Sequence, residues 1–187
     1  MANSTITRRA IATAFKQLLA TTPFDRVTVT AVASQCGINR QTFYYHFRDI
    51  YDLMSWIVED RVRSVLGYSN MDLPENTEVI VEACLVALKE EQDFVTRLLH
   101  SLDPVAINHI LQAHLGKVIE KSLEKIYEQS KLTEDNKRII TSFVVGGFLN
   151  VLYTWANDGM REDPSLLAHR VATIVCSSLR AVIPQLS

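Results

Sequence analysis

The chain has 187 residues, 48% of them apolar and 21% charged, which is the balance of a globular protein with a sizeable core. Its 6 Gly and 5 Pro provide too few turns for a β-sandwich, and its net charge of −2 by itself argues weakly against nucleic acid. The longest weakly polar stretch, residues 143–156, is shorter than the ~20 residues of a membrane span, and no signal-peptide stretch opens the chain. We expect a soluble, cytoplasmic protein with no membrane partner.

Charge is distributed unevenly along the chain. Residues 1–48 contain six Lys or Arg side chains and one acidic side chain, whereas the remainder is acidic. A basic segment attached to an acidic body is typical of a module that faces nucleic-acid phosphates.

Apolar residues at helical spacing predominate from the N-terminus onward. A first helix is expected to begin at Thr5 or Thr7 and to end before the break at Thr22–Pro23. Residues 27–30 have strand propensity, but the apolar spacing that follows favours a helix with Thr28 as its N-cap.

A turn and two further helices are expected next. Gly37 supplies the turn, because that position needs a positive φ. Asn39 can cap a short helix over residues 40–46, and Asp49 can cap a longer one over residues 50–66. Together with the helices before it, the short helix predicts a three-helix helix-turn-helix domain.

The rest of the chain is expected to form a helical regulatory and dimerisation domain. The polar stretch over residues 67–74 is the expected seam, and helices are expected beyond it over residues 75–90, 93–100, 105–130, 134–158 and 165–183. The predicted fold class is therefore all-α. The expected domains are residues 1–49 and 50–187, linked by the helix over residues 50–66.

The second helix of the predicted motif has an inner and an outer face. Phe43 and Phe47 lie four residues apart and are expected to anchor the helix in the core. The outward residues combine hydroxyl groups, which reach phosphates, with groups that read base edges. They are Arg40, Gln41, Thr42, Tyr44, Tyr45 and His46. Exposed tyrosines gain nothing on a solvated helix, so this surface predicts DNA binding.

These residues resemble a known family. The pattern Thr-x-x-x-Val-Ala-x-x-x-Gly-Ile-x-x-x-Thr-Phe-Tyr-x-His-Phe over residues 28–47, followed by an acidic cap and Leu53, is similar to the DNA-binding domain of TetR-family transcription regulators. The resemblance implies a dimer on a palindromic, double-stranded operator, with no cofactor. It implies that Thr42, Tyr44 and His46 contact the DNA backbone and that Arg40, Gln41 and Tyr45 are candidate base readers. It also implies that Thr28 and Thr30 bind DNA.

Residues 40–57 further resemble the dihydroxyacetone kinase regulator-like subgroup of that family. One departure is Ile50, where many relatives carry a phosphate-clamping Lys at the start of the fourth helix. Arg48 and the backbone N–H groups beside Asp49 are expected to make that contact instead.

In this family the last two long helices usually pair with those of a second subunit. Residues 134–158 have two apolar stripes, and such a helix needs a partner on each side, either in its own subunit or outside it. The expected interface comprises Phe143, Gly147, Asn150, Val151, Thr154, Val171, Ile174, Val175 and Leu179.

The sequence predicts an effector cavity less clearly than it predicts DNA binding, because the candidate lining residues are also typical of an ordinary hydrophobic core. These residues are Cys84, Phe94, Leu98, Tyr127 and Trp155. His100, His109 and His114 raise the alternative of a metal-responsive sensor. However, His109 and His114 are five residues apart, with no carboxylate or thiol at i+4 from either, so surface or capping roles and no bound metal are expected. The resemblance also allows control by a protein co-regulator in place of a small molecule.

Catalysis is not expected. The sequence contains no Gly-rich phosphate loop, Gly-x-Ser-x-Gly elbow, Cys-x-x-Cys or His-Glu-x-x-His motif. Cys36, Cys84 and Cys176 are widely spaced among apolar neighbours, which favours buried reduced thiols. The sequence therefore predicts a DNA-binding transcription regulator, with a helical adaptor that binds only protein as the alternative.

Overall fold

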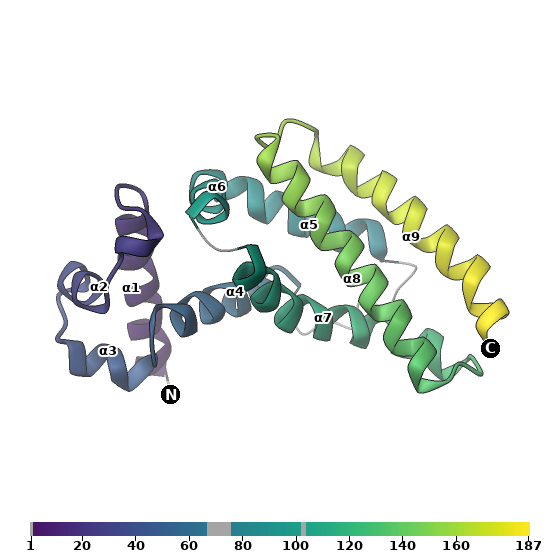
Figure 1. Cartoon of the computed structure of the whole chain (residues 1–187), viewed down its shortest axis with the longest axis horizontal. Helices are drawn as coiled ribbons and strands as arrows, with labels where there is room; N and C mark the ends of the chain where they lie inside the picture. Colours follow the sequence, from purple (N-terminus) through teal and green to yellow (C-terminus); the bar gives the residue numbers. More distant parts are fainter. Residues whose placement is uncertain (1, 67–75, 102–103) are drawn as a thin grey trace.

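The computed structural model describes residues 2–66, 76–101 and 104–187, and within these ranges the regular structure is entirely helical (Figure 1). The N-terminal elements are α1 (Ala2–Leu19), the short 3-10 helix η1 (Phe24–Arg26), α2 (Val29–Cys36) and α3 (Arg40–His46). The remaining helices are α4 (Ile50–Leu66), α5 (Thr77–Glu90), α6 (Gln92–Ser101), α7 (Pro104–Glu128), α8 (Glu134–Asn157) and α9 (Pro164–Leu186). The all-α prediction is confirmed, while the expected seam over residues 67–74 lies outside the described ranges.

The helix-turn-helix is set by local signals. The Thr28 side chain accepts a hydrogen bond from the backbone N–H of Ala31 at 3.2 Å, so the strand-prone segment starts a helix as predicted. Gly37 then adopts φ 71°, in the left-handed region that favours glycine, and redirects the chain. The Asn39 side chain accepts from the N–H of Thr42 at 2.7 Å and starts α3.

The helices form an elongated molecule (Figure 1). The group α1–α3 lies at one end, and α4 extends from it toward the centre, where it meets α5 and α7. At the other end α8 packs on α7, and α9 packs mainly on α5. The DNA-binding candidate surface and the expected dimerisation helices are therefore at opposite ends of the molecule.

The core of the N-terminal domain continues into the body. Ile11, Phe15, Val32, Phe43 and Leu53 are fully buried within one cluster. Residues of α6 and α7 pack against that same cluster, among them Phe94, Leu98, Ile107 and Ile110. Because these residues are closely packed, a shift of α6 or α7 would change the packing of the core that supports the helix-turn-helix.

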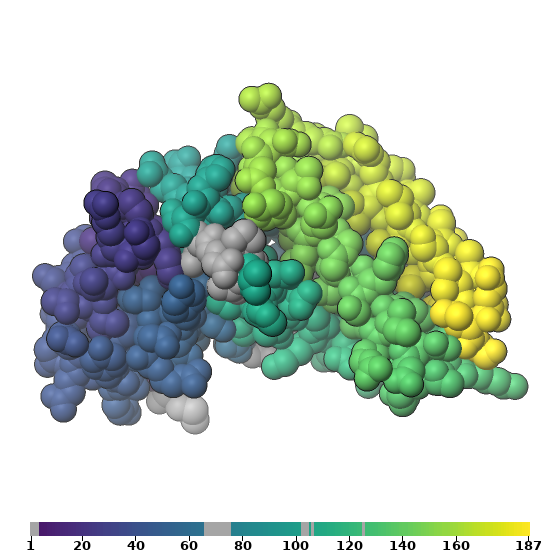
Figure 2. All heavy atoms as spheres, viewed as in Figure 1, coloured from purple at the N-terminus to yellow at the C-terminus, as the bar shows by residue number. Residues whose placement is uncertain are grey.

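The two C-terminal helices leave apolar side chains exposed. The uninterrupted weakly polar stretch is short, but α8 and α9 as whole helices are long and apolar enough to pass a length-and-composition test for a membrane span, which core helices of soluble proteins also pass. Within the subunit, 39% and 28% of their apolar windows are buried. Figure 2 shows the two helices forming the surface at one end of the molecule. The large exposed apolar residues there are Ile139, Phe143, Tyr153, Leu166, Ile174, Val182 and Leu186. This surface resembles one face of a protein interface.

Candidate functional site

The α3 helix is held rigidly from beneath. Phe43 is completely buried and Phe47 is 3% exposed, and their ring centroids lie 5.8 Å apart, so the predicted anchoring is confirmed. The guanidinium carbon of Arg8 on α1 lies 5.6 Å from the centre of the Phe47 ring, a cation–π arrangement that joins α1 to the end of α3. A rigid support of this kind fixes the direction of the outward side chains.

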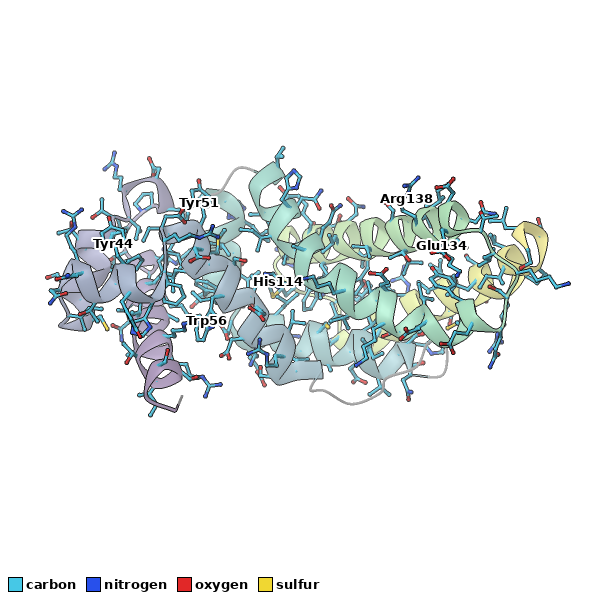
Figure 3. The ribbon with its side chains drawn as sticks, turned by 90° about the horizontal axis from the view of Figure 1, so that it is seen from below. Tyr44, Tyr51, Trp56, His114, Glu134 and Arg138 are labelled. Atoms are coloured by element: carbon cyan, nitrogen blue, oxygen red, sulfur yellow. The ribbon has the colours of Figure 1, made fainter. Side chains whose placement is uncertain are left out.

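The outward face of α3 carries the residues that the sequence pattern indicated. Tyr45 is 82% exposed and Tyr44 is 50% exposed, and Figure 3 shows Tyr44 toward the end of the molecule formed by the N-terminal helices. Arg40 and Gln41 in the first turn are also exposed, together with Thr28 and Thr30 at the start of α2, whereas Thr42 and His46 are half-buried. Exposed Arg and Gln side chains and hydroxyl groups are the kinds of group that contact DNA bases and phosphates.

Arg40 and Tyr44 contact each other on the surface of α3. The Arg40 guanidinium donates a hydrogen bond to the Tyr44 hydroxyl at 3.4 Å, and its carbon lies 5.9 Å from the centre of that ring. The two side chains were expected to have separate roles, as base reader and backbone contact. Their contact means that a substitution of Tyr44 also changes the freedom of Arg40.

The basic segment is partly neutralised by acidic groups. Arg9 pairs with Asp60 at 3.4 Å, Lys16 pairs with Glu91, and Arg48 pairs with Asp52 at 3.4 Å. Within the described ranges, the segment's remaining cations, Arg8, Arg26 and Arg40, make no ion pair with a carboxylate. The phosphate-facing charge is therefore smaller than the sequence count suggests.

Two further features limit the expected phosphate contacts. Burial and the nearby positive charge of Arg8 lower the pKa of His46, so this imidazole is neutral at neutral pH. At the start of α4 the N–H of Asp52 already donates to the Asp49 carboxylate at 2.8 Å, and the N–H of Arg48 donates to the Asp52 carboxylate at 2.9 Å. A phosphate at this helix terminus would compete with both carboxylates, and the Arg48 side chain, although 86% exposed, would have to leave Asp52 to reach it.

A capped, rigidly supported helix that presents Arg, Gln and Tyr side chains next to a positive-φ turn defines a helix-turn-helix DNA-binding regulator. Comparison with known families agrees. Residues 11–55 match the family described as bacterial regulatory proteins, tetR family, and residues 75–176 match a transcriptional regulator C-terminal region. The chain belongs to the TetR family of transcription regulators.

Individual relatives include both an activator and a repressor. Over 60 residues the chain is 38% identical to the HTH-type dhaKLM operon transcriptional activator DhaS of Lactococcus lactis, an alignment that spans only 32% of each protein. It is 28% identical to the HTH-type transcriptional repressor BepR of Brucella suis over 96% of this chain and 95% of that one. A solved structure of the dihydroxyacetone kinase operon activator DhaS covers 94% of this chain and 97% of its own with a TM-score of 0.69, which at 18% identity shows a shared fold.

An apolar cavity of about 160 Å³ lies among α4, α5, α6, α7 and α8. Three of the expected residues, Cys84, Phe94 and Leu98, line it, and burial raises the pKa of the Cys84 thiol to about 12. The other two do not line it. Tyr127 is buried in a separate cluster, where its hydroxyl lies 3.0 Å from that of Thr141.

Trp155 is buried too, and its indole N–H donates to the carbonyl of Glu162 at 3.0 Å. These local partners explain the burial of Tyr127 and Trp155 without an effector. Three charged residues, Lys16, Arg61 and Glu91, also line the cavity. The sequence did not predict this, because they come from α1, α4 and the junction of α5 with α6, which are far apart along the chain.

The expected interface residues divide into two groups. Phe143, Gly147, Asn150, Thr154 and Ile174 are exposed, and the Phe143 side chain is 79% exposed. The others face the subunit's own core: Val171 and Leu179 are buried, and Val151 and Val175 are half-buried against it. The available surface is therefore narrower on α9 than expected.

The three histidines that were considered as metal ligands do not form a metal-binding cluster. His100 and His109 are exposed, whereas half-buried His114 contacts Ser55 of α4. Across the described part of the chain, no group of three His, Cys, Asp or Glu side chains is placed to hold a metal ion.

Proposed function

We propose that this regulator binds a two-half-site operator as a homodimer in the cytoplasm, and that a compact apolar effector in the cavity sets its DNA affinity. The observation that carries the proposal is that the cavity and the DNA-binding core share a wall. Met54 and Ile57 of α4, Phe94 and Leu98 of α6, and Ile107 of α7 belong to both.

The shared wall supplies a physical route for regulation. A ligand in the cavity contacts both α4 and α6, and both helices contact the domain that carries α3, so the ligand can stabilise one arrangement of these helices over another. A small molecule changes DNA affinity only if it binds the DNA-competent arrangement and the alternative arrangement with different affinities. This site meets the geometric requirement for such a difference.

The exposed apolar surface of α8 and α9 supports the dimer. Side chains such as Phe143 and Ile174 gain free energy when a second copy covers them, at about 25 cal/mol per Å². In a two-fold dimer the two α3 helices are expected to meet successive major grooves about 34–36 Å apart. A two-fold dimer would therefore favour a palindromic operator.

The proposal can be tested by identifying the operator and then measuring how a small molecule in the cavity changes operator affinity. Purified protein would first select its operator from genomic fragments, and 1-hexanol would serve as a neutral apolar probe of the cavity. We expect 1-hexanol to raise the melting temperature of the protein and to change its operator affinity. Leu98→Trp, which fills the cavity, should abolish both responses, whereas the volume-conserving Leu98→Met should retain them.

Two results would contradict the proposal. An unchanged 1-hexanol response in Leu98→Trp would place the probe elsewhere, and a probe that binds without altering operator affinity would separate the cavity from regulation. Control by a protein co-regulator would then be the better account.

A further inference from the structure

Building on the proposed effector cavity, we infer that its ligand is a compact apolar carboxylic acid. The carboxylate is expected to bind Arg61 and Lys16 at the cavity rim in competition with the protein's own Glu91.

At the rim two cations, Lys16 and Arg61, share the Glu91 carboxylate, and Arg61 also pairs with the more exposed Glu90. The Glu91 side chain bridges them, with Oε2 on the Lys16 ammonium and Oε1 3.7 Å from Nε of Arg61. All three side chains line the cavity and are 28–36% exposed. Charges on partly buried side chains interact more strongly than charges on fully exposed ones, because the effective dielectric constant is lower.

Arg61 has a hydrogen-bond donor left over. Its Nη2 donates to the Ala87 carbonyl at 2.9 Å and to the Glu90 carboxylate at 2.6 Å. Its Nε is buried with no hydrogen-bond acceptor in the described structure, since the nearest Glu91 oxygen is too distant. A buried unsatisfied donor is costly, so a ligand that supplies an acceptor gains more here than it would at a satisfied rim.

The same observation decides against a cationic ligand. An amine would have to displace Lys16 from Glu91 and also from the Phe94 ring, whose centre lies 4.8 Å from the ammonium. It would also leave the Arg61 Nε donor without an acceptor. A carboxylate supplies that acceptor and competes with Glu91 for Lys16 and Arg61.

The cavity volume limits the apolar part. A dry cavity of 150 Å³ in another protein holds one benzene molecule, so about 160 Å³ accommodates roughly five or six carbons without displacement of the walls. Hexanoate, with five carbons beyond its carboxyl group, is a suitable probe. 1-Hexanol and hexylamine match it in tail length and differ in the head group.

The competition has a consequence for the DNA-binding domain. Lys16 belongs to α1, whereas Glu91 and Phe94 belong to the body, so their contacts tie the two domains together. A ligand carboxylate that takes Lys16 and Arg61 releases Glu91 and loosens that tie. Removal of the Glu91 charge should therefore strengthen hexanoate binding and mimic its effect on DNA affinity.

The experiment measures binding of the three probes by calorimetry to the full-length protein. We expect hexanoate to bind at least about tenfold more tightly than 1-hexanol, and hexylamine to bind more weakly than either. Arg61→Met should reduce hexanoate affinity to that of 1-hexanol, and Glu91→Gln should increase it. Arg61→Lys, which keeps the charge but lacks the Nε donor, should lie between the wild type and Arg61→Met. Unchanged 1-hexanol affinity in each variant would show that the cavity remains folded.

The outcomes separate this inference from the proposed function. If 1-hexanol binds in the cavity and hexanoate binds no more tightly, the carboxylate assignment is wrong while the effector cavity stands. Tighter binding of hexylamine would transfer the head-group site to Glu91 and also overturn the assignment. If no probe binds, both the carboxylate and the effector cavity are wrong.

Discussion

The hydroxyl oxygen of Ser55 on α4 lies 2.9 Å from Nε2 of His114 on α7. His114 lies near the middle of the molecule (Figure 3), so this contact joins the helix that leads to the DNA-binding domain to the body. Burial is the main cause of a lowered His114 pKa; the charges of Lys117 and Arg63 lower it further, against an opposing effect of Glu59. The folded protein thus favours neutral His114.

The His114–Ser55 contact predicts a pH-dependent stability. The unfolded chain binds a proton at His114 near pH 6.5, whereas the folded chain binds it only at lower pH. This contribution to stability is therefore intact above pH 6.5 and decreases as the pH falls through the folded pKa. We expect the melting temperature to fall less between about pH 7.5 and 5.5 in His114→Gln than in the wild type, with exposed His109→Gln as the control. If the melting temperatures of the wild type and His114→Gln fall in parallel with pH, His114 does not contribute to the pH dependence of stability.

Gly147 provides a clean test of the dimer surface. A Cβ added there meets no heavy atom within 4 Å in the subunit, so Gly147→Phe should leave the subunit fold intact. If α8 packs closely on a second copy, the added ring overpacks that interface by about 1–3 kcal/mol. Sedimentation should then show a weaker dimer for Gly147→Phe but not for Val105→Phe, a matched exposed position on α7. A tight dimer in both variants would place the interface elsewhere.

Arg40 is expected to read a base. A bidentate contact between arginine and guanine discriminates by about 1–3 kcal/mol, whereas a phosphate contact contributes to every sequence alike. Arg40→Ala should therefore reduce affinity for the selected operator more than for a scrambled duplex. Because Arg40 donates to the Tyr44 hydroxyl, Tyr44→Phe should reduce the same ratio partially. If Arg40→Ala weakens both duplexes equally, Arg40 holds phosphate and Gln41 or Tyr45 is the better reader.

The salt dependence of DNA binding tests the phosphate contacts. The logarithm of affinity falls with the logarithm of salt by about 0.9 for each neutralised phosphate. The exposed Arg48 is the expected substitute for the missing lysine at Ile50, so Arg48→Ala should reduce the slope by about one per subunit. Arg138→Ala, on α8 at the opposite end of the molecule (Figure 3), should leave the slope unchanged. Equal slopes for Arg48→Ala and the wild type would exclude this contact.

Local signals in the sequence were sufficient for the helix-turn-helix. Thr28, Asn39 and Asp49 each cap the next helix through a backbone N–H three residues on, and Gly37 alone supplies the positive φ between α2 and α3. Such interactions depend only on neighbouring residues, so a single sequence specifies them. The outward face of α3 followed from the same spacing once Phe43 and Phe47 were assigned to the core.

Only the tertiary structure decided how distant helices meet. Nothing in the sequence near Lys16 indicates that Glu91 lies beside it, since the pair is 75 residues apart and depends on the packing of α1 against α6. The orientation of α9 was also undetermined, because apolar residues occur around most of its circumference. Packing on α5 turned Val171 and Leu179 inward and left Ile174 outside. Helical periodicity gives the faces of one helix, but the partner of each face is set by the free energy of packing the whole chain.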